Sequence, residues 1–165
     1  MLALYALLLA ETPGVNSPVE FDCERVQIID RPSENCSDIF GRSVEASVGP
    51  TVSGFPTVKI THQPAWGTGF STEAVTLLQP EGRSYRHLWF HILVRGEQRP
   101  DASGTMEEWE EASYEWSLDP AGKRITVTGS RTISSVDSGQ PVGQPEVLPS
   151  EAYCYSAQTR RFEKC

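Results

Sequence analysis

The chain has 165 residues, of which 38% are hydrophobic, and its formal net charge is −8. This length suits one domain and is too short for two domains with separate cores. Nucleic-acid binders and proteins that bind anionic membranes need a basic face. Because 22 acidic residues outnumber 14 basic ones, the composition argues against both classes and favours a basic protein as a partner.

Residues 1–10 form an apolar run in which the hydroxyl of Tyr5 is the one polar side-chain group. A membrane span needs about 20 apolar residues, so no stable span is expected. We interpret the run as the remnant of a signal peptide that ends near Ala10. This predicts a periplasmic or extracellular protein, from a bacterial source by its bias toward Arg, with a single β domain over residues 11–165. No Lys or Arg precedes the run, so a buried N-terminal helix or strand is the alternative.

The first half of the chain contains several candidate strands. Residues 19–30 mix acidic and apolar side chains and are predicted as a strand with some helical character. Residues 41–54 are rich in Ser and Gly and are expected to form loops. Residues 57–62 alternate between polar and apolar side chains, which predicts a strand, and the apolar segment 73–79 predicts another.

Residues 84–94 form the strongest apolar stretch, and residues 95–104 are expected to follow as a polar loop. In a strand, alternate side chains lie on opposite faces of the sheet. One face of this strand would carry His87, Trp89, His91 and Leu93. The other face would carry Leu88, Phe90, Ile92 and Val94.

The clearest local signal is a hairpin. Residues 113–118 and 124–128 alternate between polar and apolar side chains, and the segment between them contains Asp119, Pro120 and Gly122. Proline presets the backbone of a turn and glycine supplies a positive φ, so these residues predict a turn that joins two antiparallel strands. Residues 134–150 contain five Pro and Gly residues and are expected to form a long loop.

Four cysteines lie toward the two ends of the chain, at Cys23, Cys36, Cys154 and Cys165. None belongs to a Cys-x-x-Cys motif, so neither a zinc site nor a thioredoxin-type redox site is expected, and no cofactor is expected. In an oxidising compartment the four would form two disulfides, whereas in a reducing one they would be buried thiols. Pairing within each end and pairing between the ends are both open.

The C-terminal end bears on this choice. Residues 153–156 and 160–164 are candidates for a hairpin around a three-residue loop. In that register Cys154 lies opposite Phe162 and too far from Cys165 for a disulfide. Local pairing here therefore requires a wider loop, and otherwise one of these cysteines pairs with the N-terminal end.

These short strands, separated by Pro and Gly, predict a mainly β fold. We expect a small antiparallel sandwich or barrel with long Pro/Gly loops. A face that carries Tyr85, His87, Trp89 and His91 is a candidate binding surface for a sugar, a peptide or a protein. The alternative is that a second layer of the fold covers this face.

Residues 107–111 concentrate four carboxylates around one indole: Glu107, Glu108, Trp109, Glu110 and Glu111. Such a run is a candidate docking patch for a basic partner. The alternative interpretation is that the run forms a solvated edge strand, whose charges prevent it from pairing with the edge strand of another sheet. We do not expect these residues to be catalytic, because adjacent exposed glutamates are far more often a solvated surface, and the fold sets the separation of a catalytic carboxylate pair.

Motifs for hydrolases, phosphate loops, dinucleotide sites and EF-hands are absent from the sequence. The leading hypothesis is an exported, non-enzymatic β domain that binds a partner protein or a cell-envelope component. The alternative is a small hydrolase or metal-dependent enzyme that uses His87 and His91 with a carboxylate such as Glu107 or Glu110. On a strand, however, these histidines stand about 13 Å apart, so no metal site is predicted.

Overall fold

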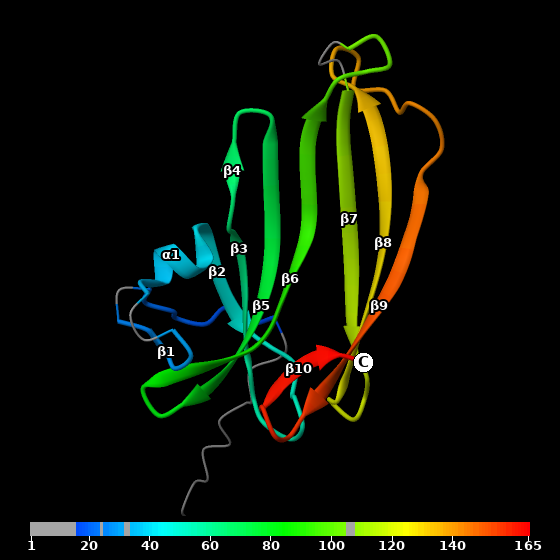
Figure 1. The fold of residues 1–165 in the computed structure, drawn as a ribbon. Helices are drawn as coiled ribbons and strands as arrows, with labels where there is room; N and C mark the ends of the chain where they lie inside the picture. The colour runs from blue at the N-terminus through cyan, green and yellow to red at the C-terminus, as the bar shows by residue number, and fades with distance from the viewer. Residues whose placement is uncertain (1–15, 24, 32–33, 105–107) are drawn as a thin grey trace, which may run out of the picture.

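The strands of this chain form one mainly antiparallel sheet (Figure 1). The computed structural model describes residues 16–23, 25–31, 34–104 and 108–165, so the expected signal peptide, residues 1–10, lies outside the described residues. The elements are β1 (Gln27–Ile28), α1 (Cys36–Phe40), β2 (Arg42–Val48), β3 (Val58–Gln63), β4 (Trp66–Gly67), β5 (Phe70–Glu81), β6 (Ser84–Arg99), β7 (Glu108–Leu118), β8 (Arg124–Ser135), β9 (Glu146–Ser156) and β10 (Arg161–Lys164). The predicted mainly β class with antiparallel pairing is confirmed, except that β1 pairs in parallel with β6.

The sheet is open. Its strand order is β10-β9-β8-β7-β6-β5-β3-β2, with β1 added to β6 and β4 added to β5. Among the described strands, β10 and β2 therefore end this order, and the sheet is not closed into a barrel. A sandwich is not confirmed either, because the described strands all belong to one sheet. Within the described ranges, the chain contains no helix long and apolar enough to cross a membrane.

A buried core lies where β6 and β7 separate, because these two strands pair along only part of their length. Residues 94–99 of β6 pair with residues 108–113 of β7, and beyond this stretch the two strands separate (Figure 1). Apolar side chains fill the space between them: Val52, Val75, Leu77, Leu88, Trp89, Ile125, Val127 and Phe162. Trp116 and Leu118 of β7 pack against this inner cluster. We call the face of the sheet that carries these two side chains the inner face, and the opposite one the outer face.

A second buried cluster packs the N-terminal segment and α1 against β3 and β5, and consists of Ile28, Cys36, Phe40, Val58, Ile60 and Leu78. Residues 74–79 of β5 are all buried, because a cluster lies against each of its faces. His62 links these elements, since its Nδ1 lies 2.7 Å from the carbonyl oxygen of Phe40 and its Nε2 lies 3.0 Å from Oγ1 of Thr76. Burial lowers the pKa of this imidazole.

Two predictions for the N-terminal part are wrong. Of residues 19–23 and 25–30, only Gln27 and Ile28 form a strand, β1, because the chain turns where Arg25 and Val26 donate their backbone N–H groups to the carbonyl of Asp22. Residues 41–54 were expected to be a loop, but they contain β2, which pairs with β3. Val44 and Ala46 of β2 pack against the second cluster, so burial outweighs the weak strand propensity of the surrounding Ser and Glu residues.

The strands predicted over residues 57–62, 73–79 and 84–94 are present as β3, β5 and β6. The long Pro/Gly loop predicted over residues 134–150 is shorter, because β8 extends to Ser135 and β9 begins at Glu146. Pro149 therefore lies inside a strand. The pairing of β8 with β9 shifts register here, because Val127 pairs with Glu151 whereas Gly129 pairs with Leu148. Pro149 lies in this irregular stretch, where a residue without a backbone N–H is tolerated.

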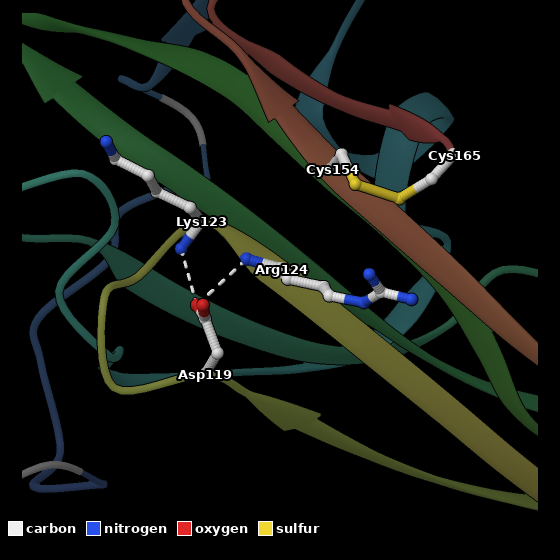
Figure 2. The surroundings of a disulfide bond; sticks show 5 residues. All are labelled: Asp119, Lys123, Arg124, Cys154 and Cys165. Carbon is white, nitrogen blue, oxygen red and sulfur yellow. Dashed lines mark hydrogen bonds between the residues drawn. A yellow bond between two sulfur atoms is a disulfide. The ribbon is translucent and has the colours of Figure 1, made fainter.

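The hairpin between β7 and β8 is confirmed. Asp119 organises its turn, because the carboxylate accepts hydrogen bonds from the backbone N–H groups of Lys123 at 2.7 Å and Arg124 at 2.9 Å (Figure 2). These two bonds hold the pKa of Asp119 below its usual value. Gly122 has a φ of +67° in the same turn, a conformation that favours glycine. Its carbonyl accepts the backbone N–H of Ser53 at 2.9 Å.

Both disulfides are local, and they join Cys23 to Cys36 and Cys154 to Cys165. In the C-terminal hairpin Ser156 pairs with Arg161 and Cys154 pairs with Glu163. The loop is therefore one residue wider than the tight version, and Cys165 follows on the same side of the ladder as Glu163. The Cα atoms of Cys154 and Cys165 lie 5.5 Å apart (Figure 2). The wider loop thus resolves the open choice in favour of local pairing.

Candidate functional site

A bulge in β6 divides the candidate face that the sequence assigned to Tyr85, His87, Trp89 and His91. His87 pairs with Leu78 of β5, whereas Trp89 pairs with Leu77, so Leu88 is the extra residue. Leu77 belongs to the inner cluster and Leu78 to the second cluster. The prediction of one shared face is therefore wrong. Tyr85 and His87 lie on one side of the sheet, and Trp89 and His91 lie on the other.

His91 and Trp89 form part of an aromatic cluster on the inner face. Their rings are parallel, with an interplanar angle of 1° and centroids 5.6 Å apart. The Tyr114 ring meets the imidazole edge-on at 5.3 Å, and Tyr153 lies 6.1 Å away. Only 3% of Trp89 is exposed, and burial lowers the pKa of His91. These two side chains therefore contribute to packing, because another part of the sheet covers them.

His87 and Tyr85 lie on the side of the N-terminal segment. The Tyr85 ring contacts Phe21 at 5.5 Å. Burial, together with the charges of Arg31 and Arg161, lowers the pKa of His87 to about 4. Because His87 and His91 lie on opposite sides of the sheet, they do not converge on the shared site that the alternative hypothesis assigned to them. In the described ranges, no group of three or more His, Cys, Asp or Glu side chains is arranged to hold a metal ion.

The acidic run is also divided between the two faces. Alternation along β7 places Glu108 and Glu110 on the inner face with Tyr114, and places Trp109 and Glu111 on the outer face. Glu107 lies outside the described residues. Because β7 pairs with both β6 and β8, the run does not lie on a strand edge, and its alternative role in protecting an edge is wrong.

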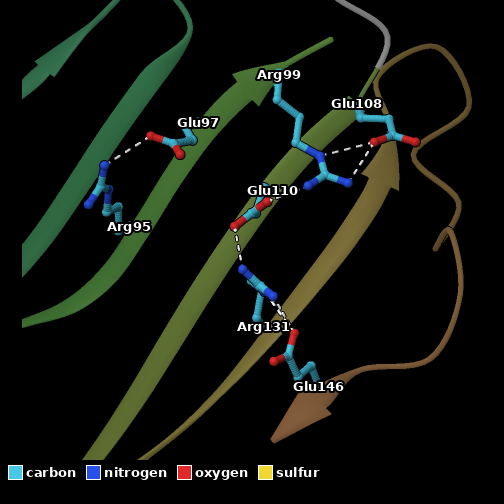
Figure 3. Close-up of polar contacts among 7 residues, drawn as sticks. All are labelled: Arg95, Glu97, Arg99, Glu108, Glu110, Arg131 and Glu146. Carbon is cyan, nitrogen blue, oxygen red and sulfur yellow. Dashed lines mark hydrogen bonds and ion pairs between the residues drawn. The ribbon is translucent and has the colours of Figure 1, made fainter. Parts of the chain in front are cut away.

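Arginines neutralise the inner-face glutamates (Figure 3). Arg99 contacts Glu108 at 2.9 Å and Glu110 at 2.8 Å. Arg131 contacts Glu110 at 3.3 Å and also pairs with Glu146. The result is a continuous chain of alternating charges across β6, β7, β8 and β9, so this part of the acidic run is a mixed-charge surface instead of an acidic patch.

The chain of ion pairs borders a pocket on the inner face. Its volume is about 210 Å³, and its lining residues are Arg95, Glu97, Glu110, Ala112, Tyr114, Arg131 and Leu148. Tyr114 connects the pocket to the aromatic cluster through its contact with His91. Gly129 makes room for this ring, since a Cβ there would lie 2.5 Å from Cδ1 of Tyr114. We call this site the inner-face pocket.

Three titratable groups in or beside the aromatic cluster, Tyr153, Glu151 and His91, have shifted pKa values. Burial and a hydrogen bond to Glu151 raise the pKa of Tyr153 to about 12. Hydrogen bonds from Tyr153 and Lys164 lower the pKa of Glu151, while burial lowers that of His91.

The arginines of the inner-face pocket and of the ion pairs beside it were not identified from the sequence. Arg95, Glu97 and Arg99 were assigned to a polar loop, although their alternation at a period of two is typical of a strand with one charged face. That signal would have extended β6 to Arg99. Arg131 and Glu146 pair across β8 and β9, and no local pattern connects them with Glu110.

Comparisons with protein-family models, with curated proteins and with solved structures found no match.

Proposed function

We propose that the protein is a non-enzymatic binding domain that works in an oxidising compartment outside the cytoplasm and holds a basic partner protein at the inner-face pocket. The observation that carries the proposal is the pocket itself, in which an apolar floor adjoins preorganised charges. Tyr114 and Leu148 supply the floor, and ion pairs hold Glu110 and Arg131 in place. A partner side chain that enters this pocket would bury apolar surface and meet charges whose positions cost little to order.

The charge balance supports a basic partner. The inner face around the pocket carries four carboxylates and three guanidinium groups, from Glu97, Glu108, Glu110, Glu146, Arg95, Arg99 and Arg131. The whole chain carries a formal net charge of −8, which would steer a basic partner toward it in dilute salt. A cell-envelope component that presents amino groups is the alternative ligand for the same pocket.

The two disulfides support the proposed compartment. Every cysteine of the chain is paired, and disulfides persist in oxidising compartments and are rare in the cytosol. Export itself, and the signal peptide predicted over residues 1–10, remain predictions.

Site-specific photocrosslinking tests the pocket. Leu148 and Val147 are neighbours on β9, but Leu148 lines the pocket, whereas Val147 is 84% exposed. We expect a photoreactive residue at position 148 to crosslink a basic protein in the cells that make this chain, and one at position 147 to give a much lower yield. We also expect Leu148→Ser to weaken binding about tenfold, the loss of about 1.4 kcal/mol of apolar contact.

Salt dependence provides the control for charge recognition. Raising the ionic strength from about 0.05 M to about 0.5 M shortens the screening length, so affinity for a basic partner should fall steeply. Equal crosslinking from positions 147 and 148, or a partner that is acidic and bound independently of salt, would contradict the proposal.

A further inference from the structure

The outer face of β7 and β8 carries a polar surface that the inner-face pocket does not use. These strands pair without a register shift from Glu108, opposite Ser135, to Leu118, opposite Ile125. Strict alternation therefore brings one set of side chains together, which we call the polar face: Trp109, Glu111, Ser113, Glu115, Ser117, Thr126, Thr128, Ser130, Thr132 and Ser134. Ser and Thr hydroxyls and two carboxylates dominate it.

Trp109 lies against the sheet at one end of the polar face. A Cβ at Gly96 of β6 would lie 2.2 Å from Cζ2 of the indole and 2.7 Å from Cε2, so the ring rests where β6 has no side chain. Nε1 of Trp109 donates to the carboxylate of Glu111 at 3.5 Å, and this carboxylate also accepts from Ser113 at 3.5 Å. The indole is only partly buried. It is thus held in a fixed orientation while part of it faces solvent.

A hollow lies further along the same face. Its volume is about 300 Å³, and it is lined by Ser113, Glu115, Thr128, Gly129 and Ser130. Glu115 and Thr128 are exposed. The lining therefore offers three hydroxyls and one carboxylate, which together can both donate and accept hydrogen bonds. From Trp109 to Glu115 the strand covers about 20 Å at ~3.3 Å per residue, which is long enough for an extended ligand.

The chemistry of the polar face selects one class of ligand. Glu111 and Glu115 disfavour anionic polymers, and between Trp109 and Ser117 the facing positions of β7 and β8 carry no Lys or Arg. A protein interface needs an apolar centre, but Trp109 is the one large apolar side chain that β7 and β8 contribute to the polar face, and the exposed Val147 lies apart from it on β9, opposite Ser130. An uncharged sugar fits better, because its C–H faces pack on an indole and its hydroxyls pair with hydroxyls and carboxylates.

We propose that the polar face binds a neutral polysaccharide that extends along β7 and β8, with one sugar ring on Trp109 and another in the hollow beside Glu115. The inference is independent of the proposed function, since the two sites lie on opposite faces of the same strands. The protein would then hold a neutral glycan on one face and a partner on the other.

Affinity electrophoresis of the full chain tests this proposal. The gels would contain soluble β-glucan, mannan or dextran as neutral probes, with alginate as the anionic comparison. We expect at least one neutral polymer to retard the protein and alginate to have no effect. Trp109→Ala should weaken retardation at least tenfold, whereas Trp66→Ala, which removes another partly exposed indole at the β4–β5 hairpin, should leave it unchanged.

A second variant guards against a folding defect, because Trp109 packs on Gly96. Glu115→Ala removes an exposed carboxylate from the hollow and is expected to weaken retardation about threefold to tenfold with an unchanged melting temperature. Leu148→Ser, which alters the inner-face pocket, should not change retardation. The proposal is overturned if no neutral polymer retards the wild-type chain, or if Trp109→Ala and Glu115→Ala are both retarded like the wild type.

Discussion

His87 illustrates how one partly buried side chain can make stability depend on pH. Its imidazole lies beside β5 and the N-terminal segment, where burial and the charges of Arg31 and Arg161 lower its pKa from 6.5 to about 4. The unfolded chain takes up a proton at the ordinary pKa, so between these values the unfolded state binds more protons than the folded one. Stability therefore falls as the pH drops from about 6.5 to about 4.

We predict that His87→Gln reduces this pH dependence. With a His87 pKa of 6.5 in the unfolded chain and about 4 in the folded one, proton linkage lowers the free energy of unfolding of the wild type by at most about 2 kcal/mol between about pH 7 and about pH 5. Urea unfolding at these two pH values measures it, for the wild type and the variant. The pKa values of Glu81, Asp119 and Glu151 are also lowered, but carboxylates titrate below this window. Burial also lowers the pKa values of His62 and His91, so these two imidazoles leave part of the pH dependence in the variant. An equal pH dependence in both proteins would contradict the assignment to His87.

At the scale of single elements, the β7–β8 turn docks on the loop between β2 and β3. Gly122 is buried and has a positive φ. A Cβ there would lie 2.6 Å from the carbonyl oxygen of Thr51 and 2.9 Å from the backbone nitrogen of Ser53. Two separate effects, backbone conformation and crowding by backbone atoms, therefore require glycine at this position.

We predict that Gly122→Ala costs about 2–4 kcal/mol of stability, of which about 1 kcal/mol comes from the positive φ. Gly139 is a matched control, because its φ is +66° and its Cβ would meet nothing within 4 Å. Gly139→Ala should cost only the conformational part. Denaturant unfolding of both variants separates the two effects, and equal losses would show that crowding at Thr51 has no cost.

At the scale of the whole molecule, a cluster of ion pairs joins the two ends of the chain. Asp30 follows β1, and Glu81 and Arg86 belong to the β5–β6 hairpin. Asp30 contacts Arg161 of β10 at 2.8 Å and Arg86 at 3.8 Å. Glu81 contacts Arg86 at 2.8 Å and also pairs with Arg160. The carboxylates are only 19% and 23% exposed, so water screens these pairs less than it screens fully exposed ones.

We predict a coupling energy of about 1 kcal/mol between Asp30 and Arg161 in a double-mutant cycle with Asp30→Asn and Arg161→Gln. The pair formed by Asp22 and Arg25 is the control, because 88% of the Arg25 side chain is exposed. Its coupling should be below about 0.5 kcal/mol. Unfolding free energies of the four proteins in each cycle provide the measurement, and equal couplings would contradict a clamp between the ends.

Local signals in the sequence determined several features of this protein. The alternation in residues 113–118 and 124–128, together with Asp119 and Gly122, was sufficient for the β7–β8 hairpin, because a turn depends on neighbouring residues. The apolar runs likewise located β3, β5 and β6. The mainly β class and the acidic character also followed from composition and local pattern, whereas the sequence left the cysteines open between disulfides and buried thiols.

Only the tertiary structure decided which of these residues meet. The bulge at Leu88 moved His87 away from His91, and one additional residue in the C-terminal loop brought Cys154 to Cys165. The partners of Glu110 come from other strands, at Arg99 and Arg131. A register shift of one residue reverses the face on which a side chain lies. The sites therefore depend on pairing between distant strands, while the strands themselves depend on local sequence.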